Sequence, residues 1–237
     1  DAIYIWERSG RQVEMTAYPL ETISAIEVGD ILLYSWLMVT GLTSEGNAGA
    51  TTVEFNTVSL DYYRPFINRV RPATTDVSES AFRIEQGKFN YLDSISYKFM
   101  NFSRASLLPG ETVIDHLWQP RIRRPILTIF SRSFYRTASV AHIAILTDQE
   151  FILILEDERS ADLKGGRYGS VRRYAPLERV AGVSVSPRGE YLVALSLTLS
   201  PDGRQLETMY QADRVDEVER FRAAVESSLI QRPPEGM

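Results

Sequence analysis

The sequence predicts a mainly β protein with a few helices, organised as two related domains that each end in a closing helix. Three observations support this fold class. One segment of the chain occurs twice, several segments alternate between apolar and polar residues as strands do, and each copy of the repeat ends in an apolar stripe of helical spacing. The chain has 237 residues, a length that accommodates two domains of modest size.

The repeat joins residues 18–28 (YPLETISAIEV) to residues 175–185 (APLERVAGVSV). An offset of 157 residues aligns Pro19 with Pro176 and falls to 155 further along the chain. We expect the two extra residues of the first copy at a hairpin tip, in the small polar run 47–51. Solenoid and propeller repeats are far shorter, roughly 20 to 50 residues, so the pattern indicates a duplicated domain.

In the second copy, residues 191–199 are apolar at every odd position, as in a half-buried strand. A turn at 200–203 (SPDG) leads into a return strand at 205–211. Asp213 is the predicted N-cap of a final amphipathic helix, whose apolar positions recur at steps of three and four. Five further strands are predicted at 112–119, 140–147, 151–156, 171–174 and 180–185.

The first copy has the same order of elements but fewer strands. A helix is predicted at 59–71, with a kink expected at Pro65. Ile3 aligns with Ile152, and nothing in this copy corresponds to residues 111–149 of the other. Its strands are predicted at 3–7, 13–18, 23–28, 32–42 and 52–56. Because five strands would leave an unpaired edge, we expect that the native chain begins earlier or that another subunit supplies the pairing.

Residues 72–106 separate the two copies. Residues 72–87 are polar and lack periodicity, which is typical of a linker. From Phe89 onward apolar residues recur at helical steps, which predicts an amphipathic helix. We expect this helix to pack on one domain or between the two, and a docking helix for another protein is the alternative. The predicted organisation is domain 1 at 1–71, linker and helix at 72–106, domain 2 at 107–230, and a disordered tail at 231–237.

Short motifs of both copies resemble those of bacterial pleckstrin-homology (PH)-like domains. They are LLPGE at 107–111, LTD at 146–148, and the PLE segments that begin at Pro19 and Pro176. The resemblance implies two PH-like β-sandwich or half-barrel domains, each closed by its C-terminal helix. It also implies a role in binding or scaffolding, with few established activities. Because a fold does not determine function, the resemblance leaves the ligand open.

Composition excludes several classes of protein. The net charge is −5, from 26 basic and 31 acidic residues, which disfavours nucleic acid as a partner. The absence of cysteine excludes disulfides, thiolate zinc sites and cysteine nucleophiles. No apolar run reaches the length of about 18 residues that a membrane span needs, and no signal peptide is visible. We therefore expect a cytoplasmic location.

Five arginines lie in the connection between the first two predicted strands of the second copy: Arg121, Arg123, Arg124, Arg132 and Arg136. In lipid-binding PH domains this connection carries the residues that grip phosphate headgroups, and the planar fork of arginine suits phosphate oxygens. We expect arginines with a structural or solvated role. Binding of an anion or an acidic protein is the alternative, and an exposed apolar run at 126–130 would indicate a contact surface instead.

Candidates for catalysis are few. His116 and His142 both fall in predicted strands, where a packing role is more common than a catalytic one. The acidic run at 156–158, with Asp162, lacks the ligand pattern of a calcium loop, and the loop at 164–170 lacks the context of a phosphate loop. We therefore predict no catalytic residue, no metal site and no cofactor.

These observations lead to one expected function and one alternative. The expected function is that of a non-enzymatic binding or scaffolding protein, which uses tandem PH-like domains to bind a protein partner or itself. The alternative is peripheral binding to an anionic membrane surface or to phosphate groups through the five arginines.

Overall fold

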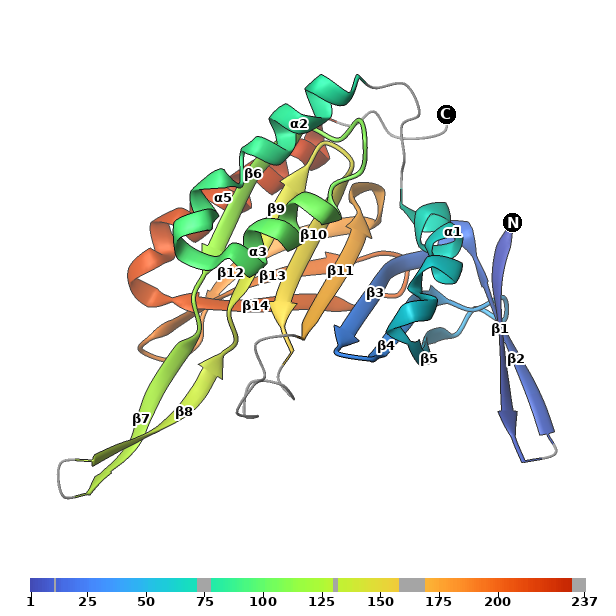
Figure 1. Ribbon diagram of the computed structural model, residues 1–237, viewed down its shortest axis with the longest axis horizontal. Helices are drawn as coiled ribbons and strands as arrows, with labels where there is room; N and C mark the ends of the chain where they lie inside the picture. Colours follow the sequence, from blue (N-terminus) through green and yellow to red (C-terminus); the bar gives the residue numbers. More distant parts are fainter. Residues whose placement is uncertain (11, 72–77, 130–131, 158–168, 232–237) are drawn as a thin grey trace.

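The computed structural model describes residues 1–10, 12–71, 78–129, 132–157 and 169–231. At residues 9, 125–129 and 132–135 only the backbone is described. The fold is mainly β, with four helices in the part described (Figure 1). We call residues 1–71 the first half and residues 107–230 the second half.

The elements of the first half and of the segment after it are β1 (Ala2–Ser9), β2 (Gln12–Pro19), β3 (Ile23–Ile31), β4 (Tyr34–Leu42), β5 (Ala48–Asn56), α1 (Leu60–Val70), α2 (Glu79–Gly87) and α3 (Asp93–Ser106). Those of the second half are β6 (Val113–Gln119), β7 (Ile122–Ile129), β8 (Arg132–Ser139), β9 (His142–Thr147), β10 (Glu150–Glu156), β11 (Ser170–Pro176), β12 (Val180–Pro187), β13 (Leu192–Leu199), β14 (Gln205–Gln211) and α5 (Val215–Ile230). Each predicted strand and each predicted helix is present, with ends that shift by a few residues.

The same order of elements occurs in both halves. A hairpin, a single 3-10 turn, three consecutive antiparallel strands, a second 3-10 turn and a helix follow one another in each half. They are β1–β2, β3–β5 and α1 in the first half, and β10–β11, β12–β14 and α5 in the second. Pro19 and Pro176 share a φ near −55°. The pairing register shifts at Ile23 in the first half and at Val180 in the second, two positions that the repeat aligns.

One seven-stranded sheet runs through both halves, in the order β5-β4-β3-β11-β10-β9-β6. Its central junction is the antiparallel pairing of β3 with β11, which sets Ile26 opposite Tyr174. The first half was expected to leave an unpaired edge. β11 covers the edge of β3, whereas β1 pairs with β2 alone among the described strands.

Two apolar clusters lie on opposite faces of this sheet. One contains Ile152 of β10 and Phe99 of α3, and it extends to the β1–β2 hairpin and α1 of the first half. The other contains Phe151 and packs the sheet against β12–β14 and Phe221 of α5. Helix α3 lies across β9 and β10, so the prediction that it packs on a domain is confirmed (Figure 1).

Three details of the sequence prediction are wrong. Part of the predicted linker forms helix α2, because the side chain of Ser78 accepts the Ala81 N–H and caps it. The arginine-rich connection forms the hairpin β7–β8, which was not predicted as strands. Arg214 rather than Asp213 is the N-cap of α5.

The alignment of Ile3 with Ile152 is also wrong, by one residue. Two cross-strand pairs define the correct match: Ala2 with Pro19, and Glu150 with Pro176. The offset from Ala2 to Glu150 is 148 residues, so Ile3 corresponds to Phe151. Since successive side chains of a strand point to opposite faces, this one-residue error exchanged the buried and the exposed face of β1.

Candidate functional site

The five predicted site arginines lie on or beside the β7–β8 hairpin, which projects from one end of the molecule (Figure 1). Arg121 forms an ion pair with Glu156 at 2.5 Å. Arg123 and Arg136 are exposed. Arg132 begins β8, and its side chain lies outside the described residues. The described side chains of this group thus differ in their surroundings, since one is paired with a carboxylate and two are exposed.

Arg124 has the most unusual surroundings of this group. Its guanidinium carbon lies 5.2 Å from the centre of the Tyr191 ring. Its Nε and Nη2 atoms are buried, and they have no hydrogen-bond partner within the described part of the chain. Arg136 stands directly opposite on β8. Like charges on paired strands repel, and unpaired buried donors cost free energy, so both features favour an anion beside Arg124.

A groove of about 780 Å³ opens next to Arg124. This volume falls in the range of ligand sites, roughly 300 to 1,000 Å³. Arg123 and Arg124 contribute two positive charges to its lining, and Glu190 and Asp213 contribute two negative charges. The groove is thus mixed in charge, with the unpaired donors of Arg124 as its distinctive feature.

A second surface lies at the other end of the molecule, on the β1–β2 hairpin (Figure 1). Four large apolar side chains are exposed on one face of this hairpin: Tyr4, Trp6, Val13 and Met15. Tyr4 and Trp6 are 60% and 65% exposed, and Trp6 lies opposite Met15. The other face of the hairpin packs into the core. We call these four residues the hairpin face; exposed apolar patches of this kind mark interaction sites.

The sequence predictions did not include the hairpin face. A signal for it is present, because residues 2–6 (AIYIW) are apolar at every position. A half-buried strand alternates between apolar and polar residues, whereas a strand that is apolar on both faces must be shielded from water on both. The one-residue error in the alignment concealed which face lacks that cover.

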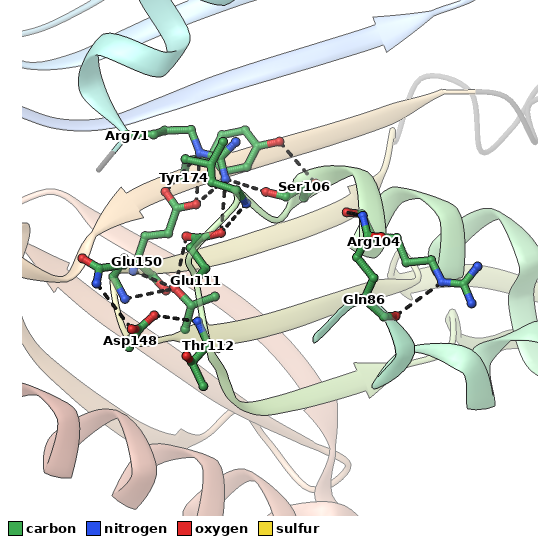
Figure 2. A network of polar contacts seen from close by, with 12 residues as sticks. Arg71, Gln86, Arg104, Ser106, Glu111, Thr112, Asp148, Glu150 and Tyr174 are labelled. Atoms are coloured by element: carbon green, nitrogen blue, oxygen red, sulfur yellow. Dashed lines mark hydrogen bonds and ion pairs between the residues drawn. The ribbon is translucent and has the colours of Figure 1, made fainter. Parts of the chain in front are cut away.

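A buried ion pair joins the two halves (Figure 2). Arg71, the C-cap of α1, donates from Nε to both carboxylate oxygens of Glu150, at 3.0 and 3.2 Å. It also donates to the Ser106 carbonyl at the end of α3, and its Cζ atom lies 3.8 Å from the centre of the Tyr174 ring. The side chains of Arg71 and Glu150 are 5% and 0% exposed. One guanidinium thus connects α1, α3, β10 and β11.

Glu111 brings a second carboxyl group to this site. Its Oε2 atom lies 4.0 Å from Nη2 of Arg71 and accepts the Leu108 N–H at 2.6 Å. Burial, and after it the neighbouring Glu150, raise the pKa of Glu111 to about 9, against the opposing effect of Arg71. At neutral pH Glu111 is therefore protonated, and one positive charge faces one negative charge.

The motifs that carried the PH-like resemblance supply part of this network. Glu111 ends the LLPGE motif, and Asp148 of the LTD motif accepts the Thr112 N–H at 2.8 Å. Thr147 of the same motif accepts the Glu150 N–H at 2.9 Å. These contacts hold the start of β6 against the β9–β10 turn. Sequence reasoning missed Arg71, because nothing distinguished it from other residues at a predicted helix end.

Both histidines have packing roles. His142 is buried in β9 with Nδ1 2.9 Å from the Val140 carbonyl oxygen, and burial lowers its pKa to about 4. His116 packs against the rings of Phe89 and Tyr91, and burial lowers its pKa as well. Both imidazoles are therefore neutral at physiological pH.

The remaining sequence candidates have ordinary contacts or lie outside the described residues. Glu156 pairs with Arg121, and residues 158–168 are not described. Ser170 donates to Asp30 at 2.9 Å. Within the described ranges there is no group of three or more His, Asp or Glu side chains that could hold a metal ion. None of the described helices is long and apolar enough to cross a bilayer.

No protein-family model matches the chain, and no curated protein matches its sequence. Its function is therefore inferred from its own residues and their geometry.

Proposed function

We propose that this chain is a non-enzymatic binding or scaffolding protein, built from two PH-like domains, that binds a protein through the hairpin face. The single observation that carries the proposal is the exposure of Tyr4, Trp6, Val13 and Met15 on one side of a regular hairpin. Aromatic residues and methionine are enriched where proteins meet, and contiguous exposed apolar residues are uncommon on isolated chains.

The order of elements supports the PH-like part of the proposal. In the second half, β6 and β9–β11 are four neighbouring antiparallel strands of the seven-stranded sheet, β12–β14 form a sheet of their own, and α5 follows. The first half has counterparts of β10 and β11, of β12–β14 and of α5. Hairpin β7–β8 then corresponds to the connection that holds the basic residues in lipid-binding PH domains.

Photo-crosslinking tests the proposed function. Tyr4 is replaced by the photoreactive residue p-benzoylphenylalanine in cells that naturally contain this protein. The replacement preserves an exposed aromatic side chain, so the fold is retained. We expect irradiation to give a discrete adduct of higher mass, whose second component is identified by mass spectrometry.

The matched control places the same residue at Tyr97. This tyrosine of α3 is equally exposed, at 63%, but lies away from the hairpin. Adducts of equal yield at both positions, or no adduct at Tyr4, would contradict binding through the hairpin face.

A second candidate function is the binding of anionic lipid or phosphate groups at the groove beside Arg124. The observation that favours it is the pair of buried donor atoms of Arg124 that lack a partner in the described part of the chain. A phosphate group would accept hydrogen bonds from both donors. Its negative charge would also offset the repulsion between Arg124 and Arg136.

Vesicle flotation tests this candidate. We expect Arg124→Gln to lower binding to vesicles rich in anionic lipid about tenfold, which corresponds to about 1.4 kcal/mol of lost interaction. Binding should also weaken as salt is raised. Arg83→Gln is the control, because Arg83 is an exposed residue of α2 that pairs only with Glu79 in the described structure. Equal losses in both variants would exclude a specific site at Arg124.

A further inference from the structure

Strand β1 has one free edge. Among the described strands it pairs with β2 alone. Its counterpart in the second half is β10, which pairs with β11 on one side and with β9 on the other. The first half therefore lacks an equivalent of β9 in the structure described.

The same strand also has an uncovered face. By the offset of 148 residues, Tyr4 and Trp6 correspond to Ile152 and Ile154. Both isoleucines are completely buried, in a cluster that includes Phe99 of α3. The hairpin face of the first half is therefore exposed, whereas the corresponding face of the second half is covered.

The apolar part of β1, residues 2–6, carries none of the usual edge protections, and the charged residues Glu7 and Arg8 follow it. Exposed edge strands are commonly blunted by charged residues, especially lysine, by proline or by a bulge. Strand β1 (AIYIWERS) contains no lysine and no proline, and its pairing with β2 is regular from Ala2 to Ser9. A regular edge beside exposed aromatic residues is a template for another strand.

We infer that a second copy of this chain occupies this edge, with β1 paired antiparallel to β1 of the other copy. This inference rests on the proposed function and names its partner. A twofold axis makes the two strands antiparallel, which is the direction of β9 relative to β10. The product is a four-stranded sheet, β2–β1–β1–β2. The corresponding part of the second half also has four strands: β6, β9, β10 and β11.

The twofold axis also brings the exposed aromatic residues of the two copies together. An axis perpendicular to the sheet places Tyr4 and Trp6 of both copies on the same face of that sheet. Aromatic side chains of paired strands then lie within contact distance across the interface and shield each other from water. Two copies of β1 can thus pair through their free backbone edges and through their exposed aromatic side chains.

The oligomeric state in solution tests this inference. Light scattering after size-exclusion chromatography should show the wild-type mass rising from one chain to two as concentration increases. We expect Trp6→Lys to weaken dimerisation about tenfold or more, because a lysine blocks an edge and a tryptophan is a typical binding hot spot. Tyr97→Lys, the control on α3, should leave the dissociation constant unchanged.

Hydrogen exchange locates the interface. The amides of residues 2–8 that point away from β2 should exchange about tenfold more slowly in the dimer than in the monomer, since pairing protects them. Met15→Lys is a second variant on the hairpin face, for use if Trp6→Lys lowers stability. A wild type that stays monomeric at every concentration, or a dimer that both lysine variants leave intact, overturns the inference.

The Tyr4 photo-adduct separates failure of this inference from failure of the proposed function. An adduct of two identical chains supports both. An adduct with a different protein, found together with a monomeric wild type, overturns the dimer and retains the binding function. The absence of any adduct, with a monomeric wild type, overturns both.

Discussion

Replacing Arg71 with methionine is expected to lower the free energy of unfolding by about 3 to 5 kcal/mol, which is the usual cost of breaking a buried ion pair. The substitution leaves the Glu150 carboxylate completely buried without its cation. It also removes the donor to the Ser106 carbonyl and the guanidinium above the Tyr174 ring. Urea unfolding at pH 7, followed by fluorescence, measures the change.

Two further variants show whether the loss of stability comes from the unpaired Glu150 carboxylate. Arg71→Met combined with Glu150→Gln should recover much of the loss, because no charge is then left unpaired in the interior. Arg83→Met, which breaks an exposed i, i+4 pair with Glu79, should cost about 0.5 kcal/mol or less. A double variant as unstable as Arg71→Met would assign the loss to packing.

Glu111→Gln is expected to remove a decline of stability with rising pH. Folding raises the pKa of Glu111 from 4.5 to about 9. Between these values the folded state holds a proton that the unfolded state has released. Raising the pH through this range therefore favours unfolding, by at most about 1.4 kcal/mol per pH unit for one proton. Because glutamine does not titrate, the variant should match the wild type near neutral pH and exceed it in stability near pH 9.

The most informative pH range lies above the ordinary pKa of histidine. His142, whose folded pKa is about 4, destabilises the protein as the pH falls below 6.5, which is the opposite trend. Urea midpoints should therefore be compared from about pH 6.5 to 9.5. Glu217→Gln is the control, because Arg214 lowers the pKa of Glu217 and keeps its titration below this range. Parallel curves for the wild type and Glu111→Gln would show that Glu111 is ionised throughout.

Local pattern predicted the elements well. The alternation at 191–199 marks β13, and the repeat of the PLE segment marks the two turns that precede β3 and β12. Prediction succeeded here because proline restricts φ and because a half-buried strand must alternate. It failed at α2 and at β7–β8, where polar residues or prolines obscure the period.

The surroundings of the candidate site residues depend on distant segments of the chain. The five arginines lie close together in sequence, but Arg121 pairs with Glu156, and of the five only Arg124 has buried donors without a partner in the described structure. Arg71 and Glu150 are 79 residues apart, and no local pattern relates them. The hairpin face became visible only when cross-strand pairing corrected the alignment by one residue.

Local sequence patterns are sufficient to predict that this chain is mainly β, that one order of elements is used twice, and where most strands and helices lie. These properties follow from periodicity, turn residues and caps, which act over a few neighbouring positions. Only the folded chain shows that β3 pairs with β11, that α3 covers β10 but leaves the equivalent face of β1 exposed, and that Arg71 is buried against Glu150. Those features depend on which surfaces meet after the chain has folded, because burial and charge pairing are set by partners far away in the sequence.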